Sequence, residues 1–326
     1  MKRLLLYIFL SIAPYVYADQ APFSIVFVHI GDQLPTYLET AINQAVLFNK
    51  EASIFLVANE RALSSLPHYP FLKTVAIESL EKSEEHMRFL ERSPLDAVSK
   101  KGFWKVTSER FFVLDELMQT YKLTHVFHLE NDNMLYVDLG KLLALFKKHY
   151  KGIGATFLND NKCISGFIYF ATPAIMHKMA EFMADQAALG LNDMQIFVQF
   201  KEREGKEAID YLPIVPNRYI DLFVLRSKVG DIAKKPERFH NHFADFQSVF
   251  DAAALGQYFG GTDPYIGPSW PYYVNTESIF DPRYFDYEWK IDQEGRAVPY
   301  ATLGDQTFRI NSLHIHSKKL QQFVSK

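Results

Sequence analysis

The chain has 326 residues, of which 48% are hydrophobic, 22% charged and 15% aromatic, a globular composition that excludes a disordered tail or a fibrous repeat. Lys and Arg number 35 against 38 Asp and Glu, which gives a formal net charge of −3; because no basic run interrupts the chain, we expect no nucleic-acid partner. A chain of this length folds without a metal or a disulfide, so any bound metal is expected to serve chemistry.

The N-terminus has the pattern of an export signal. Lys2 and Arg3 precede an apolar run from Leu4 to Val16, and Ala18 ends a segment suited to cleavage. The pattern predicts a signal peptide over 1–18 and export to a secretory lumen, the periplasm or the medium. The run is shorter than the ~20 residues that a membrane span needs. A signal anchor is the alternative, and no stable span is expected after cleavage.

The first half alternates β-branched and aromatic runs with helical patterns. We expect strands at 24–30, 53–58, 73–77 and 125–129, and helices at about 36–49 and 107–122. Strands that alternate with helices imply crossover connections. This order predicts an α/β fold with a mixed, mainly parallel sheet and helices on both faces.

The second half is less regular. We expect strands at 151–157 and 166–170 and helices at 173–189 and 193–200, followed beyond Tyr211 by a region rich in Pro, Tyr, Phe and Gly. No linker or internal repeat divides the chain. We therefore predict one domain over 19–326, with a nucleotide-binding part at about 22–140 and, at about 141–326, an acceptor part with a loop-rich C-terminal extension.

The strongest local motif follows the last strand of the first half. Glu130-Asn131-Asp132 stands at the carboxyl end of a buried strand, where ligands bind in open α/β sheets. Two hard oxygen donors one residue apart suit Mg²⁺ or Mn²⁺ bridged to phosphates. A solvated acidic turn is the alternative.

Two histidines near the C-terminus are the second candidate. His314 and His316 alternate in an extended segment, which would place both imidazoles on one face, and Lys318 could contact a phosphate. The alternative is a surface segment. A rival pair, His240 and His242, is flanked by phenylalanines that favour simple packing.

Three further residues lie between these motifs. Gly166 follows a serine and opens an apolar strand, where backbone can approach a ligand closely. Asn192 is a good helix N-cap, and Asp193 either complements the helix dipole or faces an acceptor hydroxyl. Both interpretations of Asp193 stay open.

The segment from Ser248 to Tyr273 combines aromatic rings with carboxylates, among them Asp263 and Trp270. Such turns suit carbohydrate, because flat apolar faces cover sugar C–H groups while polar edges bind hydroxyls. Ordinary aromatic core beneath a long loop is the alternative.

Taken together, these features resemble the glycosyltransferases of GT-A fold, which use a nucleotide-sugar donor. The resemblance covers most of residues 23–200 in the order of elements, together with the terminal histidine segment. It implies a nucleoside-diphosphate sugar as donor, a carbohydrate or glycosylated acceptor, and Mn²⁺ or Mg²⁺ on the diphosphate. The donor contacts that it implies are Val28, His29, Ile30, Gly31, Asn59, Arg110 and Lys318. The metal ligands that it implies are Glu130, Asp132 and His316.

On the acceptor side the resemblance points to Gly166, Asn192 and Asp263 as substrate-binding residues and to Asp193 as the catalytic carboxylate. Asp193 would be the general base of an inverting enzyme, or an acceptor contact in a retaining one. The motif departs from the family's D-x-D, because Glu replaces its first Asp, so Asp132 is the stronger ligand candidate. For Arg110 the alternative is a salt bridge within its own helix.

Two rival functions stay open. A carbohydrate-active hydrolase would use paired carboxylates such as Glu130 and Asp193 and would fit export better, because nucleotide sugars are scarce outside the cytoplasm. A catalytically silent sugar-binding protein on the same fold is the non-enzyme alternative. Dependence of nucleotide binding on a divalent metal would separate the three.

Overall fold

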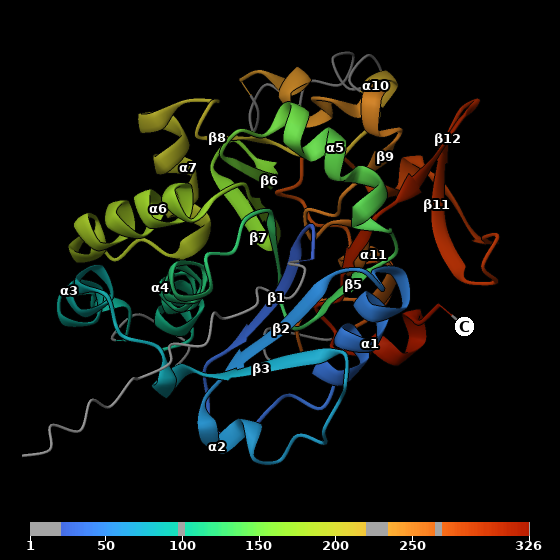
Figure 1. Ribbon diagram of the computed structural model, residues 1–326. Coiled ribbons are helices and arrows are strands. Elements are labelled where there is room, and N and C mark those ends of the chain that lie inside the picture. The colour runs from blue at the N-terminus through green and yellow to red at the C-terminus, as the bar shows by residue number, and fades with distance from the viewer. Residues whose placement is uncertain (1–20, 97–101, 220–233, 265–268, 326) are drawn as a thin grey trace, which may run out of the picture.

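The computed structural model describes residues 21–96, 102–219, 234–264 and 269–325 (Figure 1). The predicted signal peptide therefore lies outside the described residues. In the part that is described, no helix is both long and apolar enough to cross a membrane.

The centre of the fold is a seven-stranded sheet in the order β3-β2-β1-β4-β7-β6-β8. Its strands are β1 (Ser24–His29), β2 (Ser53–Ala58), β3 (Leu72–Ala76), β4 (Val126–Leu129), β6 (Ile153–Asn159), β7 (Lys162–Phe170) and β8 (Ile209–Tyr211). β1, β2, β3 and β4 are mutually parallel, whereas β7 runs antiparallel to both β4 and β6. The prediction of a mixed, mainly parallel sheet is thus confirmed.

Helices cover both faces of this sheet (Figure 1). They are α1 (Leu38–Phe48), α2 (Glu60–Leu63), α3 (Glu84–Arg92), α4 (Phe103–Tyr121), α5 (Leu139–His149), α6 (Pro173–Asp185) and α7 (Asp193–Glu204). Alternate residues of β4 point to opposite faces. The Phe127 ring therefore packs on Phe146 of α5, 4.8 Å between centroids, and His128 packs on Phe111 of α4 at 5.6 Å.

Local signals set the ends of the second-half helices. Pro173 stands in the first turn of α6 after Thr172, whose side chain accepts the N–H of Ile175. This helix ends at Asp185, earlier than predicted, and a short 3₁₀ turn follows it over Ala187–Leu189. A capping box at Asn192 starts α7.

The C-terminal region is less loop-rich than predicted. It contains α10 (Phe243–Phe246), α11 (Leu255–Gly260) and a four-stranded sheet in the order β10-β11-β12-β9. The strands of this sheet are β10 (Asp286–Ile291), β11 (Ala297–Leu303), β12 (Gln306–Ile310) and β9 (Ser248–Val249). β10, β11 and β12 pair as antiparallel hairpins, which the many turn-forming residues of this region did not indicate.

A two-stranded ribbon connects this region to the central sheet. β13 (Ser312–His314) pairs antiparallel with β5 (Asn133–Leu135), so that Leu313 lies opposite Met134 and His314 opposite Asn133. Because β5 follows the Glu130-Asn131-Asp132 motif directly, this pairing brings the end of the chain to the motif.

A buried histidine ties α3 to α4. His86 is fully buried, with Nδ1 2.8 Å from Glu116 and Nε2 3.1 Å from Glu109. Burial lowers the pKa of His86, but the hydrogen bonds to the two carboxylates outweigh it, and the pKa is raised above 6.5. The stabilisation is therefore complete below pH 6.5 and is lost as pH rises through the raised pKa.

We expect His86→Gln to lower the free energy of unfolding by about 1–3 kcal/mol at pH 6, and by less at alkaline pH. Urea denaturation from pH 6 to 9, taken as the difference from wild type, measures this. His68→Gln, at an exposed position, is the control. A pH-independent difference would contradict a charged His86.

Candidate functional site

A cavity of about 510 Å³ opens at the carboxyl ends of β1 and β4. Among the residues that line it are Val28, His29 and Ile30 after β1, and Glu130, Asn131 and Asp132 after β4. The motif therefore faces a ligand-sized space, as expected at this edge of an α/β sheet.

The β5–β13 ribbon places an imidazole between the two carboxylates of the motif. His314 Nε2 lies 2.7 Å from Glu130 Oε2 and 3.1 Å from Asp132 Oδ1. The ribbon is held from behind by Asp251, which accepts the backbone N–H of His314 at 2.9 Å. One ligand atom from each of Glu130, Asp132 and His314 lies within 4.8 Å of the others.

Opposite charges dominate the electrostatics of this cluster. Burial alone lowers the pKa of His314, but Asp132 and Glu130 outweigh it and raise the pKa to about 10. Burial alone would raise the pKa of both carboxyls. Arg110 and His314 nevertheless hold the pKa of Glu130 well below its usual range. Lys318 and His314 likewise hold the pKa of Asp132 well below its usual range. The carboxylates are therefore ionised and could bind a cation.

The donor set fits a divalent metal ion. Two carboxylates and one imidazole suit Mn²⁺ or Mg²⁺, and the cavity leaves room for the further oxygen ligands that such ions take. Ligation requires the neutral imidazole, so metal binding would release the His314 proton. Lys318 contacts Asp132 and lines the same cavity, so its ammonium could bind a phosphate beside the metal.

The structure places His314, and not the predicted His316, against the carboxylates. β13 ends at His314, and residues 315–318 leave strand geometry. The two imidazoles still lie side by side, with ring centroids 4.2 Å apart. His316 Nδ1 lies 2.7 Å from Gln257 Nε2 instead. Burial lowers the pKa of His316 to about 3, so its ring is neutral. It lines the cavity beside the cluster.

Arg110 joins the motif to the predicted catalytic carboxylate. From α4 its guanidinium contacts Glu130, and it donates to Asp193 Oδ2 at 2.8 Å and to Ser165 Oγ at 2.6 Å. Arg110 and Asp193 are both buried. Arg110 therefore does not form the salt bridge within its own helix that was the alternative. Asp193 Oδ2 is already engaged by Arg110 and Ser165.

Two buried acceptors of the cavity lack partners within the described part of the chain. They are Asp193 Oδ1 and Asn131 Oδ1, and both residues line the cavity. An unpaired buried acceptor costs about 1–3 kcal/mol, so each is suited to receive a hydroxyl or amine from a ligand. The position of Asp193 Oδ1 is compatible with the predicted contact to an acceptor hydroxyl.

Gly166 has a role other than the predicted substrate contact. A Cβ built on it would lie 2.7 Å from His314 Nδ1 and 2.9 Å from His314 Cε1, and it does not line the cavity. Its carbonyl accepts from the side chain of Asn133 at 2.9 Å. The missing side chain makes room for the imidazole.

We expect Gly166→Ala to push His314 off the carboxylates and weaken Mn²⁺ binding on the order of 10²-fold, because displacements near 1 Å have such effects. Calorimetric titration with Mn²⁺ measures this, and circular dichroism checks the fold. Gly166 is not among the residues with positive φ, so the effect is steric. Unchanged affinity would contradict this role.

Other predicted residues divide between the cavity and its support. Asp263 lines the cavity. Gly31 and Asn59 do not line it: Asn59 accepts the Gly31 N–H at 2.8 Å and donates to Glu78 at 2.9 Å, so it fixes the loop after β1. Asn192 is the N-cap of α7 and is likewise absent from the lining.

The rival histidine pair lies elsewhere. His242 stacks on His149, with ring centroids 4.0 Å apart, and its Nε2 lies 3.3 Å from Asp210. Neither His240 nor His242 lines the cavity. The pair therefore belongs to aromatic packing, as the flanking phenylalanines indicated.

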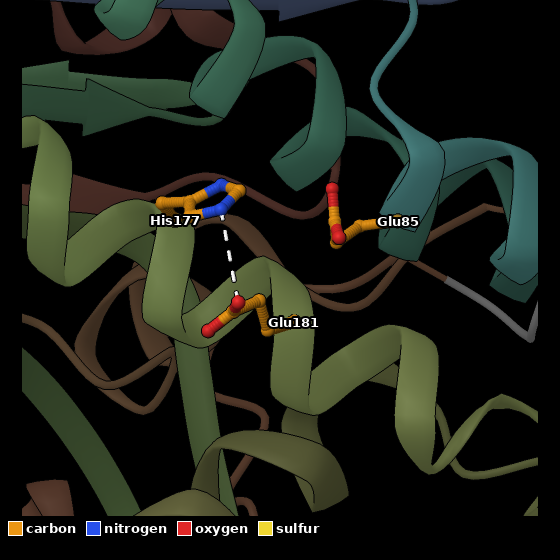
Figure 2. Close-up of side chains that lie close together, drawn as sticks. All are labelled: Glu85, His177 and Glu181. Atoms are coloured by element: carbon orange, nitrogen blue, oxygen red, sulfur yellow. Dashed lines mark ion pairs between the residues drawn. The ribbon is translucent and has the colours of Figure 1, made fainter.

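A second titratable cluster joins α3 and α6 (Figure 2). Glu85, His177 and Glu181 come together there, and Figure 2 shows the imidazole turned toward Glu181. His177 also lies 2.9 Å from the buried Asp115, and Arg88 pairs with Glu85 at 3.5 Å. None of these residues lines the cavity, so the cluster is explained by ion pairs between helices.

Sequence reasoning missed several residues of the cavity. Ser165 donates to Asp193 at 2.8 Å, and Gln257 holds His316. Tyr37 lies under Lys318, with the ammonium 5.6 Å from the ring centroid. Only Ser165, next to Gly166, carried a local signal; the other two contact the site through pairings remote in sequence.

No protein-family model and no curated protein matches the sequence. Several solved structures are similar to it. Mouse xyloside xylosyltransferase 1, in its apo form, shares 12% identity at a TM-score of 0.39 over 59% of this chain and 85% of that one. PaToxG glycosyltransferase shares 13% sequence identity at a TM-score of 0.39, and the match covers 56% of this chain and 68% of that one. The galactosyltransferase LgtC, in complex with donor and acceptor sugar analogs, shares 14% sequence identity at a TM-score of 0.37, and the match covers 61% of this chain and 78% of that one.

Proposed function

We propose that the chain is a metal-dependent glycosyltransferase that moves a sugar from a nucleoside-diphosphate donor to a hydroxyl acceptor. The observation that carries the proposal is the convergence of Glu130, Asp132 and His314 at the rim of the cavity, with Lys318 beside them. A cation site next to a fixed ammonium is suited to a diphosphate.

The bound metal ion would act as a Lewis acid on the leaving diphosphate, an effect worth several kcal/mol. Lys318 adds a second positive charge where negative charge develops. Val28, His29 and Ile30 supply the wall of the cavity at the end of β1, where the nucleoside would bind. Asp193 and Asn131 present their unpaired oxygens to sugar hydroxyls.

The hydrogen bonds that Asp193 already accepts favour a role in binding a hydroxyl over a role in abstracting its proton. Burial raises the pKa of Asp193, and the Arg110 charge opposes this rise. Its Oδ2 already accepts from Arg110 and Ser165. The remaining oxygen, Oδ1, can accept a hydrogen bond from a hydroxyl and so orient it. A carboxylate that acts as a strong base would have to be free of a cation such as Arg110. We propose that Asp193 positions a substrate hydroxyl.

A hydrolase with Glu130 as its acid is less well supported. The acid of such an enzyme needs a raised pKa, whereas Arg110 and His314 hold the pKa of Glu130 low. A thermal-shift screen of nucleoside diphosphates, with and without Mn²⁺, tests the assignment. Ligand at ~100 Kd should add ~2.7 kcal/mol, and only with Mn²⁺. Folded protein that responds to no nucleotide would refute a transferase.

We also propose that residues 1–18 are a signal peptide and that the mature chain, from residue 19, is a single exported domain. Its nucleotide-binding part would span about 22–140 and its acceptor part about 141–326. We expect the intact mass of the protein recovered from its export compartment to lack the first 18 residues. Retention of Met1 in that material would favour a signal anchor.

A further inference from the structure

A second cavity, of about 350 Å³, adjoins the first. The two share the side chains of Gln257, Asp263, Asn275, Glu277 and His316. Hydrogen bonds fix this shared wall: Asn275 donates to Gln257 at 3.0 Å, and Gln257 lies 2.7 Å from His316. The second cavity is therefore continuous with the proposed catalytic site on the side of His316.

Three exposed aromatic side chains lie in the segment between Asp263 and Asn275, two residues that line this cavity. Trp270 is 72% exposed, Tyr272 74% and Tyr273 44%, and Tyr273 also lines the cavity. We call these three residues the aromatic ridge. In the aromatic segment predicted to suit carbohydrate, Tyr258 packs against Tyr287 and against the inner side of the ridge at Tyr272, while the ridge residues keep much of their surface exposed. Exposed aromatic surface of this kind indicates a binding function.

The backbone beneath the ridge is fixed before any ligand binds. Gly261 follows α11 with φ +90°, and a Cβ on it would lie 2.7 Å from the backbone nitrogen of Trp270. The N–H of Tyr272 donates to the carbonyl of Tyr258 at 2.5 Å. Tyr272 itself has φ +68°, an uncommon conformation for a large side chain. These contacts fix the backbone that carries the ridge, and such preorganisation favours binding.

We propose that the second cavity and the aromatic ridge together form the acceptor subsite and bind a neutral oligosaccharide. The proposal rests on the proposed glycosyltransferase function. Flat rings cover the C–H faces of pyranose units, while the amides and carboxylates of the shared wall accept and donate to hydroxyls. Two carboxylates, Asp263 and Glu277, line the second cavity together with His316, and Glu277 pairs with Lys162 at 2.6 Å. None of the described residues that line the second cavity is Lys or Arg, so its lining offers an anionic glycan no cationic partner.

The test uses a glycan microarray of neutral and sialylated oligosaccharides, followed by calorimetry with the best-bound neutral one. We expect wild type to bind neutral glycans, and Trp270→Ala/Tyr273→Ala to bind them at least about tenfold more weakly, as for central aromatic contacts. The Mn²⁺-dependent nucleotide shift of the variant should equal that of wild type. Trp289→Ala is the control, because Trp289 is 42% exposed but stands on β10, where its ring packs on Tyr136.

Three results would overturn the proposal. The first is equal glycan binding by the variant, and the second is a wild type that responds to nucleotide and Mn²⁺ yet binds only sialylated glycans or none. The third is a dimer that dissociates in the variant in analytical ultracentrifugation, which would assign the ridge to self-association. Glycan binding without any nucleotide response would instead refute the transferase itself, so the two failures are distinguishable.

Discussion

Asp132→Asn is expected to abolish the Mn²⁺-dependent stabilisation of the protein by nucleoside diphosphates. The substitution keeps the size of the side chain and removes its charge. It therefore removes one metal ligand and the partner of both His314 and Lys318. The ~2.7 kcal/mol that a ligand adds at ~100 Kd should fall to nearly zero at the same concentration if affinity drops 10²-fold or more. Glycosyl transfer should be lost with it.

Differential scanning fluorimetry with UDP or GDP and Mn²⁺ measures this effect. Asp286→Asn is the matched control, since Asp286 is exposed on β10 and lines neither cavity. The same titration separates the two histidines: His314→Gln should behave like Asp132→Asn, whereas His316→Gln should keep most of the Mn²⁺ response. The reverse order would move the metal to His316, and a full response in Asp132→Asn would eliminate this site.

The sequence could predict the carboxylate half of this site because its signals are local. A continuous buried strand ends at Leu129, and turn-forming residues follow, so the position of Glu130 and Asp132 at the sheet edge depends only on neighbours in the chain. The same holds for the parallel arrangement of β1 to β4, which follows from strand and helix order. These elements therefore required no knowledge of distant contacts.

The sequence indicated the pair His314 and His316, but which of the two meets the carboxylates could not be predicted, because that depends on pairing between segments far apart in sequence. Alternation placed His314 and His316 on one face, but the ribbon with β5 ends at His314. Where a strand ends is set by its partner, and here the partner has only three residues, Asn133–Leu135. The role of Gly166 could not be predicted for the same reason. A side chain is excluded there by His314, which is remote in sequence, and not by residues next to Gly166 in the chain.

Removal of the Arg110 charge should cost a large part of the stability of the fold. Its side chain is 9% exposed and its guanidinium lies between Glu130 and Asp193. Arg110→Met would fill similar space but leave the buried Asp193 without a cation and Glu130 with His314 alone. Breaking a buried pair in this way costs about 3–5 kcal/mol, a large part of the roughly 5–15 kcal/mol of a typical domain. We expect this loss in urea denaturation at pH 7.5, together with loss of nucleotide binding.

The pH dependence distinguishes this cause from lost packing. Without Arg110, burial would raise the pKa of Asp193 further in the folded state, so the folded variant would bind a proton that the unfolded chain releases. Its stability should therefore rise as pH falls from 7.5 toward 5, relative to wild type. Arg88→Met is the control, because its 3.5 Å ion pairs are partly exposed and should contribute at most about 1 kcal/mol.

Neutralising the carboxylates completes the argument. Arg110→Met/Glu130→Gln/Asp193→Asn removes the uncompensated charges, so it should recover much of the lost free energy of unfolding and flatten its pH dependence. It should not recover nucleotide binding, because Glu130 also belongs to the metal cluster. Arg110→Lys keeps one positive charge without the planar fork and should fall between wild type and Arg110→Met. A triple variant no more stable than Arg110→Met would mean that Arg110 acts through packing, and the guanidinium would then lose its assigned role of holding the metal-binding and hydroxyl-binding carboxylates ionised side by side.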